Sequence, residues 1–254
     1  MNVTKLPSWR VCLLAVMATP PLSLHAQTAA KLETSKQPAA CVLPKGRDVL
    51  LKLMQCCTRD LASDRDCREY DPVNKYVIIK DNAPSKPAAF LLIPSEKVRG
   101  IDDKRIFKTP YLNLWANAWD QSERYPGWGD HRIGMAINSA HARTQDQLHV
   151  HISCIDAKVA EILDRHEKNA KPHTVQLPPA NNTYNVTTVN DLTDGQSPFQ
   201  IARQIPDMGK MADKSVAVVK SKEPGRYYVL TTAYKDSKGG AAEELLDQRC
   251  GVNP

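Results

Sequence analysis

Two histidines in the middle of the chain alternate with apolar residues, a spacing that would place both imidazoles on one side of a β-strand. Over residues 147–154 the apolar side chains would face a core. The polar ones would face outward about 6.6 Å apart: Gln147, His149, His151 and Ser153. Imidazoles presented in this way can bind a metal ion or attack an electrophile. The preceding residues, 138–146, form a polar loop that could fold over this row.

On the residues alone, three interpretations of this pattern remain open. His149 and His151 could be ordinary side chains on a solvated strand face. They could bind zinc or iron, and the nearest further candidate ligands are His141, Asp146 and Cys154. The alternation would place Cys154 on the opposite face, so a third ligand is not evident. Finally, one neutral imidazole could act as a nucleophile at phosphorus.

The elements that must position this segment are predicted from hydrophobic periodicity. Strands are expected over residues 75–81, 88–94, 132–138, 147–154, 215–220 and 226–232. Helices are expected over residues 47–55, 111–124, 156–169 and 241–248. Trp115 and Trp119 fall at helical spacing and are expected in the core. Because strands and helices are interspersed without regular β-α-β alternation, the sequence indicates an α+β fold with a largely antiparallel sheet flanked by helices.

Two segments share one pattern. Residues 75–94 and 214–233 each begin with a lysine and a strand, followed by a polar loop with proline and a second strand. This pattern could be a decayed internal repeat. Its second half, from about residue 180, would then lack a histidine strand.

Length, composition and charge exclude several classes of protein. The chain has 254 residues, 42% of them hydrophobic and 24% charged, which excludes a disordered or collagen-like chain. A negative mean hydropathy excludes a polytopic membrane protein. The net charge of +6 comes without a basic patch interleaved with aromatic residues, so nucleic acid is not an expected partner. Weak peripheral contact with an anionic membrane surface is expected instead.

The first residues have the pattern of a secretory signal peptide, expected over residues 1–26. The basic residues Lys5 and Arg10 precede an apolar stretch, 11–24, that is too short to span a membrane as a helix. A cleavage site follows at Ala26, and an uncleaved N-terminal anchor is the alternative. Residues 27–44 then resemble a linker, which leaves 45–254 as the catalytic domain.

Cysteine usage supports export. Removal of residues 1–26 also removes Cys12, and an even set remains: Cys41, Cys56, Cys57, Cys67, Cys154 and Cys250. An even set in an exported chain indicates disulfides. Cys154 and Cys250 could tie the C-terminus to the core, and the other four could then pair around the first helix. A metal site is the alternative, although adjacent cysteines at 56 and 57 lack the usual two-residue zinc spacing.

The segment Gln147-Leu-His149-Val-His151-Ile resembles the motif of the histidine triad (HIT) superfamily of nucleotide hydrolases and transferases. The longer string from Asn138 to Cys154 is similar to one branch, the CDP-diacylglycerol pyrophosphatases, and the likeness runs from about Cys56 to Cys250. The resemblance implies a HIT-like fold. The family's first triad histidine is here Gln147, which can still donate or accept a hydrogen bond.

The resemblance further implies hydrolysis of CDP-diacylglycerol to CMP and phosphatidate through a cytidylyl-histidine intermediate. His149 would be the nucleophile and His151 would stabilise the phosphate. The expected substrate-binding residues are Asn138, Arg143, Thr144, Gln145, Gln147 and Ser153. Lys97 is a further candidate for the outer phosphate by its charge. Neither a metal nor another cofactor is expected, because the leaving phosphatidate is a stabilised anion.

Such an enzyme of phospholipid metabolism would act in the periplasm or at the periplasmic face of the inner membrane. Three alternatives remain open at this point. One is HIT-type chemistry on another nucleotide diphosphate. The second is a metal-dependent hydrolase that uses His149 and His151. The third is a binding module with a decayed site, which Gln147 makes conceivable. The oligomeric state is left open.

Overall fold

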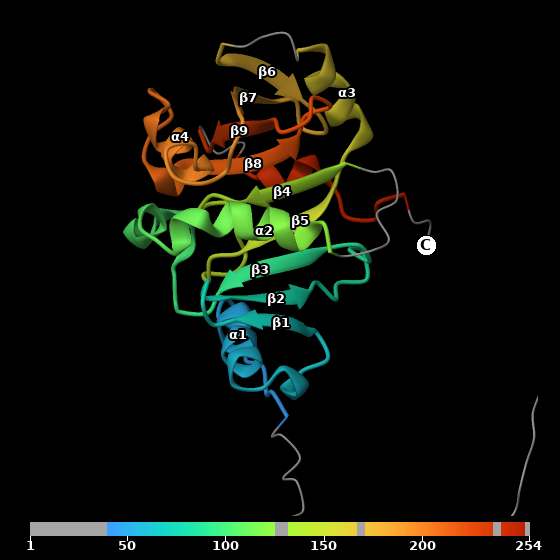
Figure 1. The fold of residues 1–254 in the computed structure, drawn as a ribbon, viewed down its shortest axis with the longest axis vertical. Helices are drawn as coiled ribbons and strands as arrows, with labels where there is room; N and C mark the ends of the chain where they lie inside the picture. Colours follow the sequence, from blue (N-terminus) through green and yellow to red (C-terminus); the bar gives the residue numbers. More distant parts are fainter. Residues whose placement is uncertain (1–39, 125–131, 167–170, 236–239, 252–254) are drawn as a thin grey trace, which may run out of the picture. The chain divides into compact units, whose positions relative to one another are not determined.

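A single antiparallel β-sheet organises the chain. The computed structural model describes residues 40–124, 132–166, 171–235 and 240–251. Their strands follow the order β1-β2-β3-β5-β4-β8-β9-β7-β6 (Figure 1). Strand β10 pairs with the end of β5, past the residues of β5 that pair with β3. The bounds are Cys67–Asp71 (β1), Tyr76–Lys80 (β2), Phe90–Pro94 (β3), Ile133–Ile137 (β4), Val150–Ile155 (β5), His173–Leu177 (β6), Asn182–Val189 (β7), Lys214–Lys220 (β8), Tyr227–Ala233 (β9) and Leu246–Asp247 (β10). The predicted α+β architecture with an antiparallel sheet is confirmed.

Four α-helices cover this sheet: Val49–Arg59 (α1), Leu114–Ser122 (α2), Ala157–Arg165 (α3) and Pro198–Gln204 (α4). Helix α2 packs across β3, β4 and β5, and its Trp115 and Trp119 are buried as expected (Figure 1). Trp115 contacts Phe199 of α4 with ring centroids 5.6 Å apart. The start of α3 is fixed because the Asp156 side chain accepts hydrogen bonds from the N–H groups of residues 158 and 159.

Alternation along the strands divides the core between the two faces of the sheet. Val150 and Ile152 of β5 belong to the cluster that α2 and α4 cover. On the opposite face, α1 covers β2 and β3, whereas α3 covers β4, β8 and β9 together with a 3₁₀ helix, Ala242–Leu245 (η6). The polar side chains of β5 point to this second face, between the two apolar clusters. The sheet therefore presents its histidine row in a gap between helices.

Three disulfides join the described chain: Cys41–Cys56, Cys57–Cys67 and Cys154–Cys250. The expected pairing of Cys154 with Cys250, and of the other four among themselves, is confirmed. Cys41 falls within the predicted linker, yet it is bonded to α1, and its N–H donates to the Ser63 carbonyl at 3.1 Å. The remainder of the linker and the predicted signal peptide lie outside the described residues. No helix among the described residues is long and apolar enough to cross a membrane.

Several sequence expectations need correction. The strand expected over 147–154 begins only at Val150, because Gln147 instead bridges to Arg99 in an adjoining segment. The helix expected over 241–248 is η6 followed by β10, because residues 246–247 pair with β5. Three strands and one α-helix were not predicted at all: β1, β6, β7 and α4. The segments 75–94 and 214–233 both contain antiparallel hairpins, and the internal repeat stays a prediction.

Candidate active site

His149 is oriented by the backbone two residues before it. Its Nδ1 atom lies 2.7 Å from the carbonyl oxygen of Gln147. Because a carbonyl oxygen only accepts, Nδ1 carries the proton, and Nε2 of the neutral ring presents a lone pair. Nε2 has no hydrogen-bond partner among the residues that the structure describes. This is the arrangement that a nucleophilic imidazole requires.

The surroundings of His149 hold its ring neutral. The side chain is only 7% exposed, and burial lowers the pKa of His149 below 6.5. The hydrogen bond to the Gln147 carbonyl and the charge of Glu243 oppose this shift, whereas Lys86 and Arg143 add to it. The net direction is downward, so the ring is unprotonated near pH 7.

His151 lies directly beside His149, with ring centroids 4.7 Å apart in an edge-to-face arrangement. Burial lowers the pKa of His151 well below 6.5, and the neighbouring His149 ring adds to this shift. Its Nε2 atom is 3.3 Å from Oε2 of Glu243. That contact is not aligned as a hydrogen bond, and neither ring nitrogen has a hydrogen-bond partner among the described residues. The two imidazoles therefore form a neutral pair with unused hydrogen-bonding capacity.

The expectation that the polar row faces solvent is wrong. Gln147, His149, His151 and Ser153 are all buried. Residues 94–98 enclose Gln147 through its hydrogen bonds, and Glu243 of the C-terminal segment 242–250 lies beside His151. The Ser153 hydroxyl donates to the carbonyl of Asp247 at 2.8 Å, so it anchors this segment. Direct contact between Ser153 and substrate stays a prediction without geometric support.

Gln147 anchors a neighbouring segment of chain. Its Nε2 donates to the carbonyls of Glu96 at 2.7 Å and Pro94 at 3.2 Å, and its Oε1 accepts from the N–H of Val98 at 3.2 Å. The hydrogen bonds of the Gln147 side chain are therefore made to backbone groups at and just after the end of β3. Its backbone, by contrast, orients His149.

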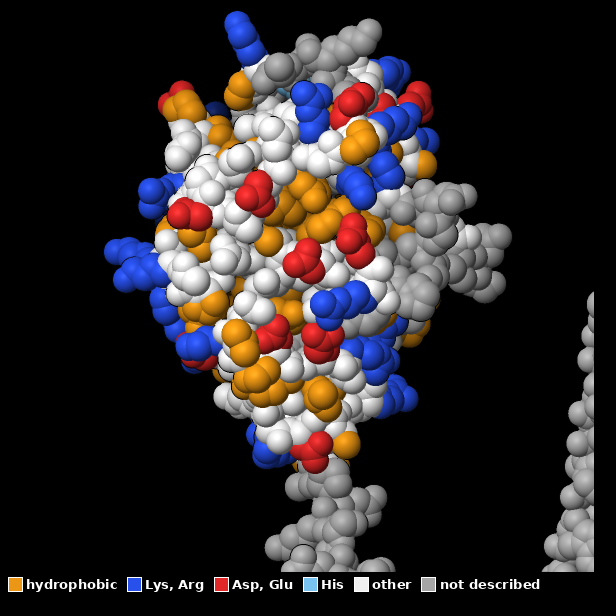
Figure 2. All heavy atoms as spheres, viewed as in Figure 1, with side chains coloured by type: hydrophobic (Ala, Val, Ile, Leu, Met, Phe, Trp, Pro, Cys, Tyr) orange, Lys and Arg blue, Asp and Glu red, His pale blue; other side chains and the backbone are white. Residues whose placement is uncertain are grey.

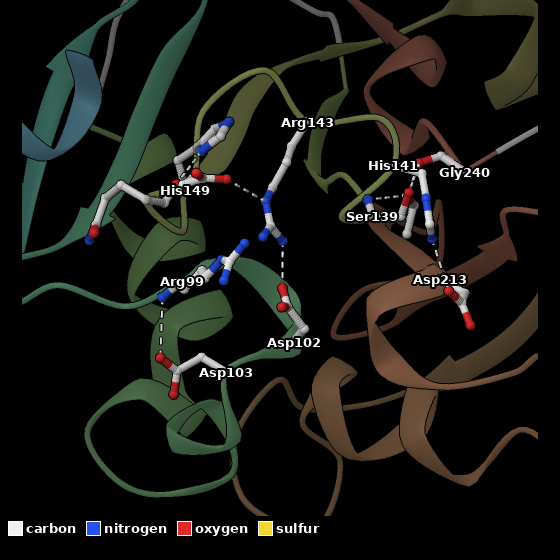
Figure 3. Close-up of polar contacts among 12 residues, drawn as sticks. Arg99, Asp102, Asp103, Ser139, His141, Arg143, His149, Asp213 and Gly240 are labelled. Atoms are coloured by element: carbon white, nitrogen blue, oxygen red, sulfur yellow. Dashed lines mark hydrogen bonds and ion pairs between the residues drawn. The ribbon is translucent and has the colours of Figure 1, made fainter. Parts of the chain in front are cut away.

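Arg143 reaches from the polar loop into the site region and is buried (Figure 3). Its Nη1 donates to Oδ1 of Asp102 at 2.5 Å, and its Nε lies 3.7 Å from Oδ1 of Asp146. Gly100 provides the space: its φ is +56°, and a Cβ there would be 1.9 Å from Nη1. Only glycine combines this backbone conformation with the close approach of the guanidinium.

The structure brings some of the predicted binding residues together and separates others. A small hollow is lined by Gly100, Ile137, Asn138, Arg143, Gln147, Leu148 and His149. Thr144 is exposed, and Gln145 instead holds the start of α1, because its Oε1 accepts from the N–H of Leu50 at 3.2 Å. Lys97 is exposed on the wall of a separate cavity of about 340 Å³, which it shares with Arg99 and Gln147.

Sequence reasoning missed Glu243 and Lys86. Oε2 of Glu243 accepts from Nδ2 of Asn138 at 3.0 Å, and the N–H of Glu243 donates to Oδ1 of the same amide at 3.0 Å. Lys86 forms an ion pair with Oε1 of Glu243. The contact between Asn138 and Glu243 spans 105 residues along the chain. The sequence of η6 has no periodicity that would indicate a carboxylate at this site. No sequence signal could have identified this pair.

Another serine, histidine and aspartate lie near the site but do not form a nucleophilic triad (Figure 3). The Ser139 hydroxyl is buried and donates to the Gly240 carbonyl at 2.9 Å. His141 lies 3.0 Å from Oδ1 of Asp213 and stacks on Tyr234. No group of three or more His, Cys, Asp or Glu side chains in the described ranges could hold a metal ion. The ligands considered for a metal site are therefore not assembled: His141 pairs elsewhere, and Cys154 is oxidised.

Comparison with known sequences gives one consistent result. A family described as CDP-diacylglycerol pyrophosphatase matches residues 45–254. A probable CDP-diacylglycerol pyrophosphatase of Mycobacterium leprae is 32% identical over 177 residues, which are 65% of this chain and 65% of that protein. A CDP-diacylglycerol pyrophosphatase of Yersinia pestis is 28% identical over 223 residues, covering 82% and 85% of the two chains.

Among solved structures, the crystal structure of yeast Ap4A phosphorylase in complex with AMP is similar to 79% of this chain. The match covers 71% of that chain with a TM-score of 0.43 and 14% identity. The same enzyme in complex with Ap4A matches 70% of this chain and 64% of its own, with a TM-score of 0.39.

Proposed function

Because this chain belongs to the CDP-diacylglycerol pyrophosphatase family, we propose that it is a hydrolase that cleaves the diphosphate of CDP-diacylglycerol to CMP and phosphatidate. The observation that carries the proposal is the state of His149. Its Nδ1 is held by the Gln147 carbonyl, and burial keeps the ring neutral. Nε2 is then the nucleophilic atom, as the HIT-like motif implies.

In the first step, Nε2 of His149 attacks the phosphorus next to the cytidine. A bond forms between nitrogen and phosphorus, and the bond from this phosphorus to the bridging oxygen breaks. The electron pair leaves with that oxygen, which becomes part of the phosphatidate. The remaining group is a cytidylyl-histidine, and its positive ring is stabilised because Nδ1–H still donates to the Gln147 carbonyl.

In the second step, a water molecule attacks the same phosphorus. The new phosphorus–oxygen bond forms as the bond to Nε2 breaks, the water proton passes to solvent, and CMP is released. His149 returns to its neutral form with the proton still on Nδ1. Division of the hydrolysis into two displacements lowers the barrier that water alone would face.

The negative charge on the phosphoryl oxygens needs donors close to His149. Asn138, Arg143 and His151 are the side chains that lie there. Donors that are fixed in advance stabilise a transition state better than mobile water does, because they need no reorganisation. The Arg143 guanidinium is fixed in this way by Asp102. The proposed route relies on these side chains and asks for no metal ion.

The disulfides support an oxidising compartment, and with the predicted signal peptide they favour export to the periplasm or to the periplasmic face of the inner membrane. Figure 2 shows acidic and basic side chains intermingled over the viewed face. Large hydrophobic side chains that are exposed are few among the described residues: Val42, Leu43, Leu61 and Val73. We therefore propose only weak peripheral contact with the bilayer that holds the substrate.

The decisive experiment measures CMP release from CDP-diacylglycerol in mixed micelles by the purified oxidised protein. The expected result is turnover that a chelator does not abolish and that the His149→Asn variant lacks. Substrate labelled in the cytidine should leave label on the wild-type protein after rapid quenching in alkaline denaturant, because a phosphorus–nitrogen bond to histidine is labile in acid. Absence of CMP release, with release from a soluble nucleotide diphosphate instead, would favour HIT-type chemistry on another substrate. Activity lost to a chelator and restored by one metal would favour a metal-dependent hydrolase.

A further inference from the structure

Polar side chains from distant parts of the chain converge on the carboxylate of Glu243. Asn138 donates from Nδ2 to Oε2 at 3.0 Å, and Nε2 of His151 lies 3.3 Å from the same oxygen. Gln248 donates from Nε2 to Oε1 at 3.2 Å, and Lys86 forms its ion pair there. We call Lys86, Asn138, His151 and Gln248 the anion cradle. It is a set of amide, imidazole and ammonium groups around a single anion.

The anion cradle lies beside the proposed nucleophile. His151 is one of its members, and its ring is 4.7 Å from that of His149, centroid to centroid. The charges at the cradle also act on His149, because Glu243 raises the pKa of that ring and Lys86 lowers it. An anion held in this cradle therefore lies against His151, whose ring is next to that of His149.

The chemistry of the anion cradle suits a phosphoryl group. Phosphate and carboxylate oxygens accept the same charge-assisted hydrogen bonds, and one lysine with neutral donors is a common surrounding for both. The cradle holds one cation, Lys86, whose ammonium is also 3.4 Å from Asp81. A carboxylate and a phosphoryl group could not share these donors, because two anions this close repel each other strongly at low dielectric.

We propose that the anion cradle binds a phosphoryl group of the substrate and that Glu243 is an internal competitor, which the phosphoryl group displaces. The inference rests on the proposed function, and it assigns a binding role to Lys86 and Gln248. The reaction itself needs only His149 and donors. The cradle reduces the affinity for the substrate, because the substrate must first displace the Glu243 carboxylate from the phosphoryl-binding site.

The local geometry allows this displacement without unfolding. The backbone N–H of Glu243 donates to Oδ1 of Asn138, independently of the Glu243 side chain. Rotation of that side chain toward solvent therefore leaves the Asn138 amide oriented, with its N–H groups still aimed into the cradle. The Glu243 side chain is 22% exposed, so it has a path to water. The backbone around it stays fixed by β10 and by the Cys154–Cys250 disulfide.

An internal competitor reduces the apparent affinity of the site. If the carboxylate leaves the cradle in about a tenth of molecules, a phosphoryl ligand binds about tenfold more weakly than it would to an open cradle. Replacement of the carboxylate by a neutral amide of the same size removes most of this competition. The Glu243→Gln variant should therefore bind CMP about tenfold more tightly than the wild type does.

The test is titration calorimetry with CMP on the oxidised full chain. Glu244→Gln is the matched control, because it has the same substitution and the same change of net charge on the same 3₁₀ helix. Glu244 contacts Asn182 and Tyr184 instead of the cradle. Its CMP affinity should stay within about twofold of wild type. Equal or weaker CMP binding by Glu243→Gln would overturn the proposal.

Two further variants keep the test decisive. Glu243→Asp shortens the side chain so that its carboxylate reaches less far into the cradle, and it should also tighten CMP binding if Glu243→Gln does not fold. Lys86→Met should weaken CMP binding about tenfold in both the wild-type and the Glu243→Gln backgrounds. An unchanged affinity in Lys86→Met would also contradict the proposal.

The calorimetric readout separates this inference from the reaction. If the wild type releases no CMP from CDP-diacylglycerol but Glu243→Gln gains CMP affinity, the proposed reaction fails and the cradle stands. If hydrolysis proceeds and Glu243→Gln gains nothing, the cradle fails and the reaction stands.

Discussion

Nδ1 of His149 and the backbone carbonyl oxygen of Gln147 are 2.7 Å apart, so the proposed nucleophile is oriented by main chain rather than by a side chain. Any residue at position 147 would offer the same carbonyl. The Gln147 side chain is not needed to orient His149. It holds the segment after β3 through hydrogen bonds to three backbone groups. This separation would allow glutamine to stand where the HIT-like motif has its first histidine, without loss of the orientation of His149.

The first prediction concerns this position. Gln147→His restores the family pattern, but a neutral imidazole offers one donor and one acceptor where glutamine makes three hydrogen bonds. We expect a loss of about 1–3 kcal/mol in the free energy of unfolding and no gain in kcat. Urea unfolding and CMP-release kinetics on the same preparation would measure both. An increase in both stability and kcat would contradict the scaffold role.

The second prediction concerns His149 itself. His149→Asn keeps a side-chain N–H that can donate to the Gln147 carbonyl but removes the nucleophilic nitrogen, so turnover should fall by roughly 10³-fold or more. Because the residue is buried, a modest stability loss should accompany the substitution. Circular dichroism and the unfolding midpoint would show that the fold persists. His141→Asn is the control, since His141 lies outside the proposed chemistry, and it should keep most activity.

The third prediction is a pH dependence. Burial lowers the pKa values of His149 and His151 in the folded chain, whereas in the unfolded chain they titrate near 6.5. Below about pH 6.5 the unfolded state binds more protons, so the free energy of unfolding should decrease as pH falls and be unaffected by these groups above that range. Because the pKa of His149 is lowered in the folded chain, the loss of kcat/KM through protonation of this ring should come at a lower pH than for an exposed histidine.

The measurement is urea unfolding at a series of pH values from 8 down to 5. The result is the slope of the free energy of unfolding against pH. In a variant that carries both His149→Asn and His151→Asn, the slope below about pH 6.5 should be smaller than in wild type. An identical slope in the two proteins would assign the pH dependence to other groups.

The fourth prediction uses Gly100. Gly100→Ala must accommodate a φ of +56° and a Cβ that would overlap the Arg143 guanidinium. We expect a stability loss of about 1–3 kcal/mol and a further rise in KM, since Arg143 must leave Asp102. Gly225→Ala is the matched control: its φ is +71°, but nothing lies within 4 Å of the added Cβ. In Gly225→Ala, only the stability loss from the strained backbone should appear, and KM should be unchanged.

The fifth prediction concerns the disulfide between Cys154 and Cys250, which closes a loop of 96 residues. Simultaneous replacement of both by alanine should reduce the free energy of unfolding by about 2–5 kcal/mol. CMP release should also fall, because residues 242–250 then lose their covalent link to β5. A double variant of Cys41 and Cys56, at the far end of the first helix, should lose stability but less activity.

The sequence was sufficient where strands are apolar and regular. The predicted strands coincide with β2, β3, β4, β8 and β9 within one or two residues, because buried side chains impose a clear period. The unpredicted β1 and β6 are the edges of the sheet, and their side chains are mostly partly exposed. Polar edge strands are specified by pairing with a neighbour, which local periodicity does not report.

The site followed the same division. His149 and His151 were identified because their spacing is local. The burial of these two histidines was not predicted, because it depends in part on a segment about 100 residues later in the chain. Glu243 and Lys86 carry no pattern of their own, and only the closed fold brings them to Asn138.

The pairing of β10 with the end of β5 has a consequence for biosynthesis. Strand β5, which contains His151, lies in the middle of the chain, yet the strand that pairs with its last two residues and one of its disulfide cysteines belong to residues 242–250. The proposed site therefore reaches its described form only after residues 242–250 have been synthesised and have folded against β5. A chain terminated before residue 242 should be impaired in the proposed hydrolysis.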